Sequence, residues 1–164
     1  MKTFLTTIAA GLILATANTT AMAGTIAALY STENQVVDKA NAQITLKLTG
    51  DANSAFKVDG SKVVMQRGGF YTVNAVAQAG GTGTGEVYLW LRVNGKDVAH
   101  SNAMLTIATP KFSGTLLTLA GMELKKNDSL EVLVSATAPG LGVISVKPPS
   151  MPEIPSITLG LLEF

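Results

Sequence analysis

The residues with the clearest catalytic potential are His100, the only histidine of the chain, and its neighbours Asp97 and Ser101. A serine hydrolase needs a serine, a histidine and a carboxylate that converge from suitable positions in the fold. Residues this close on one segment do not generally converge in that way, and the Gly-x-Ser-x-Gly motif is absent from the sequence. We therefore interpret His100 as a surface or loop side chain after a hairpin, and we assign no catalytic residue.

The ligands for a metal site are scarce. One histidine and no cysteine leave too few soft ligands for zinc or copper. Oxygen ligands gather at Asp51, Asn53 and Asp59 and again at Asn127 and Asp128, but neither group has the spacing of a calcium loop. We expect solvated turn residues there and predict no metal site and no cofactor, with calcium as the alternative. No pair of carboxylates stands out as the acid and base of a glycosidase.

Residues 80–85 read Gly-Gly-Thr-Gly-Thr-Gly and superficially resemble a phosphate-binding loop. Such a site needs a helix after the loop, whereas this segment leads into a strand and no lysine follows at the required spacing. We interpret it as a flexible loop between two strands. Loops on a rigid scaffold often carry recognition, so Gly80 and Gly85 belong to a possible binding surface, with the Pro-rich residues 147–155 as a second loop.

Tyr88 and Trp90 are the aromatic candidates for binding. They fall on the otherwise polar face of a predicted strand at residues 86–94, whose other face is aliphatic. Aromatic side chains there would stack on a sugar or a partner. The alternative, which we favour, is that core or a neighbouring subunit covers them, because Trp and Tyr are enriched at interfaces.

These candidates lie on a chain of short segments in which apolar and polar residues alternate, a pattern typical of strands. Asn94-Gly95 predicts a hairpin, and four prolines exclude residues 147–155 from a central strand. Roughly eight to ten strands separated by turns predict a two-sheet β-sandwich or jelly roll. The predicted strands are residues 42–48, 61–66, 69–78, 86–94, 112–119, 130–136, 142–146 and 157–164, with one or two more within 98–109.

The last predicted strand, residues 157–164, carries only one charge, Glu163. A terminus this apolar is not expected to fray in solvent. We predict a central strand with one face against the opposing sheet and the other against a second chain.

Residues 1–23 have the three parts of a secretory leader. Lys2 supplies the positive charge, residues 4–15 are apolar, and Ala21-Met22-Ala23 matches a cleavage signal, so we predict a single mature domain at residues 24–164. A membrane anchor is the alternative, but the apolar run is shorter than the roughly 20 residues that span a bilayer. The predicted location is periplasmic, cell-surface or secreted.

Removal of the leader takes away Lys2, one of 12 Lys and Arg residues, and leaves 11 against 11 Asp and Glu. A neutral chain argues against nucleic acid and against a polybasic membrane patch. No segment after the leader is long and apolar enough for a membrane span. Without cysteine the fold depends on its core alone, which a chain of this length can provide.

The order of the motifs carries a family resemblance. Phe56-Lys57-Val58 precedes Gly68-Gly69-Phe70-Tyr71-Thr72-Val73, and residues 87–94 with Gly95 come next. Then follow residues 112–119, residues 124–132 with the turn Leu124-Lys125-Lys126-Asn127-Asp128, and residues 156–164. This order resembles the jelly-roll domain of complement globular heads and the tumour necrosis factor (TNF) superfamily, in its bacterial and phage versions. Asn127 and Val73 depart from it, because the family usually has Gly and Phe there.

The resemblance implies a ten-stranded jelly roll, a compact homotrimer and no enzymatic activity. It assigns the subunit contacts to Tyr71, Leu117, Leu119, Leu162 and Phe164. We therefore predict an exported, non-enzymatic binding protein, such as an adhesin, that recognises a surface glycan or a protein through its loops. The alternatives are a structural coat, appendage or phage-derived particle component, and a monomeric carbohydrate-binding β-sandwich or secreted hydrolase.

Overall fold

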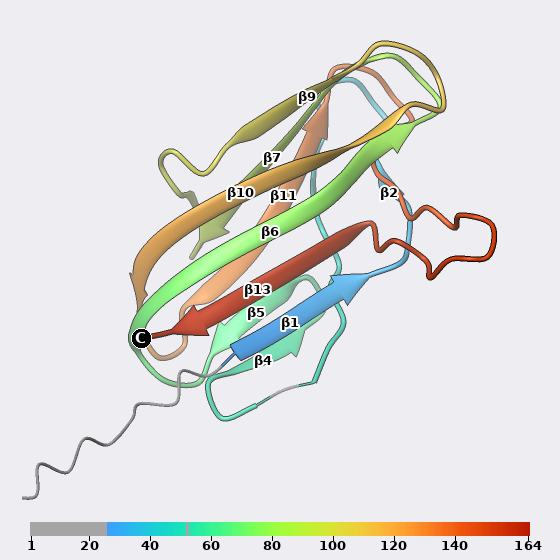
Figure 1. The fold of residues 1–164 in the computed structure, drawn as a ribbon. Helices are drawn as coiled ribbons and strands as arrows, with labels where there is room; N and C mark the ends of the chain where they lie inside the picture. The colour runs from blue at the N-terminus through green and yellow to red at the C-terminus, as the bar shows by residue number, and fades with distance from the viewer. Residues whose placement is uncertain (1–25, 52) are drawn as a thin grey trace, which may run out of the picture.

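The computed structural model describes residues 26–51 and 53–164. The predicted leader and its cleavage site lie outside the described residues. Two antiparallel β-sheets pack face to face (Figure 1), as the alternation predicted, and the described part of the chain forms thirteen strands, β1 to β13, in these sheets. Within the described residues there is no helix with the length and hydropathy needed to cross a membrane.

The six-stranded sheet, sheet A, has the order β1-β13-β6-β12-β2, and β10 pairs with the other edge of β6. The long strand β6 organises this sheet, because residues 71–77 pair with β13 and residues 79–81 pair with β12. Its strands are β1 (Ile26–Ser31), β2 (Gln35–Val36), β6 (Gly69–Gly81), β10 (Ser113–Leu124), β12 (Leu141–Val143) and β13 (Ile157–Glu163).

The seven-stranded sheet, sheet B, has the order β4-β5-β11-β7-β8, with β3 beside β11 and β9 beside β7. Its centre is the antiparallel pair of β11 and β7, which runs from Leu130 opposite Val93 to Ala136 opposite Val87. Its strands are β3 (Gln43–Thr45), β4 (Phe56–Asp59), β5 (Lys62–Met65), β7 (Gly85–Val93), β8 (Lys96–Asp97), β9 (Ala103–Ile107) and β11 (Ser129–Ala136).

The core lies between the two sheets and is filled by alternate residues of the long strands. On β6 these are Tyr71, Val73, Ala75 and Ala77, and on β7 they are Val87, Leu89 and Leu91, all buried. Successive side chains of a strand point to opposite faces, so the residues between them must face outward. The same alternation that builds the core therefore also fixes which side chains each sheet presents to its surroundings.

Two turns show how local sequence sets the connections. Asn94 and Gly95 both have positive φ, 51° and 76°, and join β7 to β8 in the manner the Asn-Gly pair predicted. Asn127, with φ 70°, occupies the left-handed region in the turn between β10 and β11. Asn tolerates that region better than other non-glycine residues, which explains how it stands where the resembling family usually has Gly.

Several predicted strand bounds were wrong. β10 continues to Leu124, five residues beyond the predicted end at 119, and β3 covers only Gln43–Thr45 of the predicted 42–48. The strand β1 was not predicted, and it pairs along its whole length with β13. This pairing makes the C-terminal strand an interior strand of sheet A, as its apolar sequence predicted.

Candidate functional site

The outer face of sheet A, directed away from sheet B, is built from the outward residues of four neighbouring strands. The register places Leu119 of β10, Asn74 of β6, Gly160 of β13 and Ala28 of β1 in one row across the sheet. A second row joins Leu117, Val76, Thr158 and Tyr30 in the same strand order. The first and the last of the described strands, β1 and β13, thus meet on one surface.

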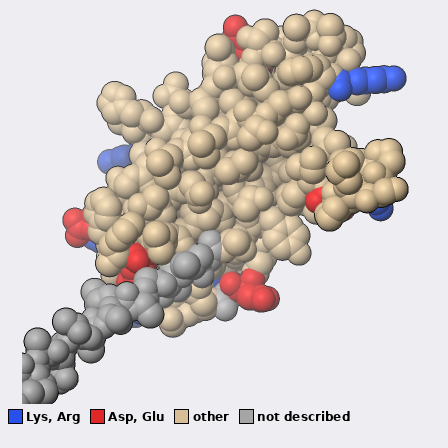
Figure 2. Space-filling view, viewed as in Figure 1, with Lys and Arg blue, Asp and Glu red and all other residues tan. Residues whose placement is uncertain are grey.

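This face is apolar and exposed. Leu117 and Leu119 are 57% and 61% exposed, Phe70 is 52% exposed and Phe164 is 63% exposed. Figure 2 shows that the charged side chains visible on this side of the molecule lie around its margin, while its middle is free of them. An exposed apolar surface with a polar margin is typical of a site that another molecule covers.

The middle of the face is hollowed around Asn74. A cavity of about 400 Å³ is lined by residues that include Thr72, Asn74, Leu119, Gly160 and Leu162. Gly160 makes room for the Asn74 side chain, because a Cβ added at position 160 would lie 2.1 Å from Asn74 Oδ1. The hollow thus presents one exposed amide among aliphatic side chains and two threonines, Thr72 and Thr158.

The C-terminal end of the face is fixed by local contacts. Phe164 N–H donates to the Phe70 carbonyl at 3.0 Å, and the two rings lie 6.3 Å apart between centroids. Arg67 forms an ion pair with Glu163, and this contact raises the pKa of Arg67. These contacts hold the terminal phenylalanine against the sheet.

Four of the five residues assigned to subunit contacts lie on this face or at its end: Leu117, Leu119, Leu162 and Phe164. Tyr71 does not. Its side chain is 1% exposed and lies in the core, where burial raises the pKa of its hydroxyl. The reason is the alternation of side chains along the strand. Tyr71 lies on the same inward face of β6 as Val73 and Ala75, and its neighbour Phe70 is the aromatic residue that faces outward.

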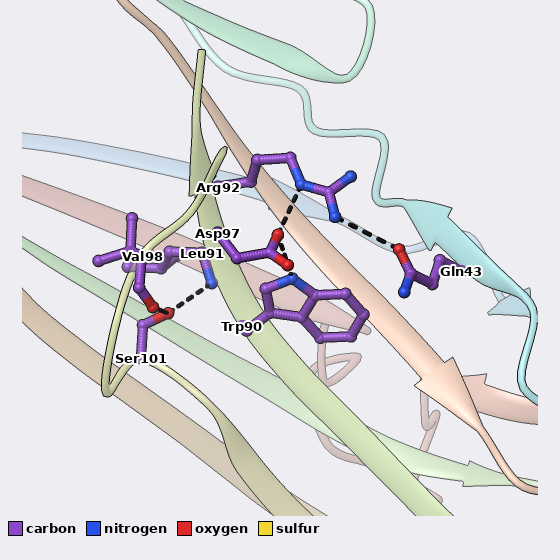
Figure 3. Close-up of polar contacts among 7 residues, drawn as sticks. All are labelled: Gln43, Trp90, Leu91, Arg92, Asp97, Val98 and Ser101. Atoms are coloured by element: carbon purple, nitrogen blue, oxygen red, sulfur yellow. Dashed lines mark hydrogen bonds and ion pairs between the residues drawn. The ribbon is translucent and has the colours of Figure 1, made fainter. Parts of the chain in front are cut away.

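Tyr88 and Trp90 lie on the outer face of sheet B, on the opposite side of the sandwich. Figure 3 shows Trp90 with Arg92, Asp97 and Gln43 in one polar group. Trp90 Nε1–H donates to Asp97 Oδ1 at 2.9 Å, and Arg92 Nε–H donates to the same oxygen at 2.7 Å. These two bonds, that from Arg92 above all, lower the pKa of Asp97. The Tyr88 hydroxyl donates to Glu86, which raises the pKa of Tyr88.

The glycines of residues 80–85 have a packing role. Gly81 and Gly85 have φ of 147° and 144°, where other residues are strained, and a Cβ at Gly81 would lie 2.0 Å from the Gly140 carbonyl oxygen. Gly80 is similarly crowded, because a Cβ added there would lie 2.6 Å from Ile144 Cδ1. The prediction of a flexible loop over residues 80–85 was wrong in its bounds, because β6 ends at Gly81 and β7 begins at Gly85. The short connection and the strand ends beside it lie against residues 137–141.

The residues considered for hydrolysis are not brought together. His100 is exposed with φ 61°, and Asp97 is engaged by Arg92 and Trp90. Ser101 is buried, where its Oγ accepts from Leu91 N–H at 3.0 Å and donates to the Val98 carbonyl at 2.8 Å. Ser101 thus ties the β8–β9 connection to β7.

Two other predicted groups are also explained by local structure. Asp128 caps its turn, with Oδ1 accepting from Asn94 Nδ2 and Oδ2 from Lys125 N–H, and these bonds lower its pKa. Asn53 Oδ1 accepts from Ala55 N–H at 2.7 Å. Among the described residues no three His, Cys, Asp or Glu side chains gather closely enough to hold a metal ion.

The sequence alone did not identify every residue of the outer faces of sheets A and B. The alternation along β6 was enough to place Phe70 on the outward face, but Asn74 stood out only once β10 and β13 were placed on either side of it. Arg92 and Asp97 are close in sequence, whereas Gln43, which accepts a hydrogen bond from Arg92 at 3.3 Å, belongs to a strand on the far side of β11. No local pattern signals that contact.

Comparison with known proteins identifies the fold. No family model matches the chain and no curated protein matches its sequence. Among solved structures, murine APRIL at pH 5.0 aligns with a TM-score of 0.57 and 12% identity, over 86% of this chain and 99% of that chain. Murine APRIL at pH 8.5 aligns with a TM-score of 0.56 and 10% identity, over 85% and 100%. APRIL is a TNF-family jelly roll, so the chain has a TNF-like jelly-roll fold.

Proposed function

We propose that the protein is an exported, non-enzymatic binding protein that assembles as a homotrimer through the outer face of sheet A. The observation that carries this proposal is the exposed apolar face centred on Leu119 and Asn74, which is free of charge in its middle. The TNF-like fold supports it, since the family resemblance implies a trimer in which this sheet faces the threefold axis.

The energetics favour covering this face. Full burial of a leucine side chain stabilises a contact by roughly 1.5–3 kcal/mol, and Leu117 and Leu119 are each more than half exposed. A threefold arrangement repeats this gain in every subunit and closes on itself, so that no copy of the face remains free. The neutral predicted mature chain adds little repulsion between copies.

The absence of enzymatic activity is proposed from the roles of the polar residues. Ser101 and Asp97, the residues most suggestive of hydrolysis, are engaged in structural hydrogen bonds, and His100 stands apart from them on a turn. Export is proposed from the leader pattern of residues 1–23 alone.

The experiment is Leu119→Asp, measured by light scattering coupled to size exclusion. A carboxylate at this exposed position leaves the core untouched but is costly to bury in a subunit contact. We expect a monomer with the circular dichroism spectrum of the parent. The matched control is Met104→Asp, which changes a 53% exposed methionine on the outer face of sheet B and should leave the trimer intact.

Three results would contradict the proposal. An unchanged trimer of Leu119→Asp would place the contact elsewhere, and a monomeric parent would remove the trimer altogether. Open-ended oligomers of the parent would favour the coat or appendage alternative, because only a closed arrangement gives a single defined mass.

A further inference from the structure

The outer face of sheet B carries a second surface, which a trimer formed through sheet A leaves free. Outward residues of β7 include Tyr88, Trp90 and Arg92, and β8 adds Asp97 opposite Arg92. Trp90 lies opposite Leu133 of β11 in the sheet register. Leu133 shares the outward parity of Trp90 but is only 1% exposed, which fits an indole that lies across it.

The indole is held in place. Its Nε1–H bond to Asp97 Oδ1 is 2.9 Å, the bond from Arg92 Nε–H to the same oxygen is 2.7 Å, and Arg92 is further bound by Gln43 at 3.3 Å. Figure 3 shows the ring broadside between β7 and the strand beside it, with the polar groups along one edge. The arrangement is therefore preorganised, and a ligand need not order these side chains when it binds.

The polar groups beside the ring remain accessible. The Asp97 side chain is 58% exposed and that of Arg92 is 23% exposed. Both hydrogen bonds from Trp90 and Arg92 go to Oδ1 of the exposed Asp97 carboxylate, which leaves the lone pairs of Oδ2 for a ligand hydroxyl. An aromatic surface flanked by an acceptor and a guanidinium donor matches a sugar ring, which has one apolar face and hydroxyls at its edge.

The charges of this surface decide which ligands it can hold. Two cations, Arg92 and Lys96, lie beside three acids, Asp97, Glu131 and Glu86, with Glu131 opposite Arg92 in the sheet register. The surface therefore has no basic excess with which to hold a polyanion. The Asp97 side chain is more than half exposed, so a ligand beside it stays in contact with water, whereas a small apolar molecule requires an enclosing pocket. We propose that the surface formed by Trp90, Arg92, Asp97 and Gln43 binds a neutral oligosaccharide. This inference rests on the proposed binding role but not on trimerisation.

The test uses the intrinsic fluorescence of the protein, because Trp90 is the only tryptophan of the chain and its emission reports this site alone. The probes are neutral hexasaccharides of glucose, mannose, galactose and N-acetylglucosamine, with heparin as the polyanionic comparison. We expect a saturable change in emission with at least one neutral hexasaccharide and none with heparin.

Two variants locate the binding. Asp97→Asn keeps the shape beside the indole but removes the charged acceptor, and should weaken binding about tenfold or more, as expected for loss of a hydrogen bond to a charged group. Asp59→Asn, at the exposed β4–β5 turn, is the matched control and should bind like the parent. Trp90→Phe retains an aromatic cover over Leu133, and calorimetry should show weakened binding.

The proposal is overturned if no neutral hexasaccharide changes the emission, or if calorimetry detects binding that Asp97→Asn and Trp90→Phe leave unchanged. Heparin binding in place of neutral sugars, or a protein partner on this face without any sugar binding, overturns it equally. The mass of the protein, measured in the same buffer, separates these outcomes from a failure of the proposed trimer.

Discussion

Asn74 offers a way to place the centre of the proposed trimer contact under pH control. It is exposed in the monomer, between Leu119 and Gly160 in the middle of the apolar face. The substitution Asn74→Asp keeps the size of the side chain and adds a carboxylate. In the monomer that carboxylate faces water, whereas the proposed trimer would bury three copies of it among largely apolar side chains.

The magnitude follows from the cost of burying a charge. Desolvation raises the pKa of a fully buried carboxyl by up to 3–5 units. If partial burial raises the pKa by about one to two units, the cost is about 1.4–2.7 kcal/mol for each copy. Three copies then weaken the charged trimer by about 4–8 kcal/mol, or roughly a thousandfold to a millionfold in the dissociation constant. The pKa in the trimer lies above that in the monomer, so protonation favours assembly.

The assay is sedimentation velocity of the variant and its parent at pH 4 and pH 8 over a range of concentrations. We expect Asn74→Asp to dissociate at pH 8 and to reassemble at pH 4, near the ordinary pKa of about 3.9 for an aspartate. Asn74→Leu, which adds no charge, should remain a trimer at both values. If Asn74→Asp stays fully assembled at pH 8, position 74 is not buried between subunits and the reasoning is refuted.

Three further predictions concern the folded subunit. Ser101→Ala leaves the buried Leu91 N–H without its acceptor, so urea unfolding should show a loss of about 1–3 kcal/mol, against no change for the exposed control Ser54→Ala. Gly142→Ala should destabilise the β12–β2 pair by about 1–3 kcal/mol or more, because its Cβ would lie 2.3 Å from the Gln35 carbonyl oxygen; a thermal midpoint equal to that of the parent would contradict this. Folding lowers the pKa of Asp128 from its ordinary 3.8, so the stabilisation from its charged form is present above that pH and is lost as the pH falls below it. Asp128→Asn should therefore flatten the fall in unfolding free energy on acidification, and an acid profile equal to that of the parent would contradict this prediction.

The sequence was informative wherever one strand decides the outcome by itself. Alternation along β6 and β7 identified their inward and outward faces, and the Asn94-Gly95 pair identified its hairpin. The apolar residues 157–164 were recognised as an interior strand. In each case the information is local, because side-chain parity and positive φ are properties of a few consecutive residues.

The candidate surfaces were less predictable, because they depend on pairings between distant strands. Leu119, Asn74, Gly160 and Ala28 form one row only after β10, β6, β13 and β1 are assembled in that order. Gln43 reaches Arg92 across β11. Tyr71 illustrates the opposite case. The family resemblance assigned it to a subunit contact, whereas the alternation along β6 placed it with the inward residues, and it is buried.

The central claim is that the outer face of sheet A is covered by other copies of the same chain. Its most direct test is the absolute mass of the purified protein in solution, by light scattering coupled to size exclusion at micromolar concentration. We predict a single species with three times the subunit mass. A monomer that persists as the concentration rises would contradict the claim and would leave the exposed Leu117, Leu119 and Phe164 without a partner.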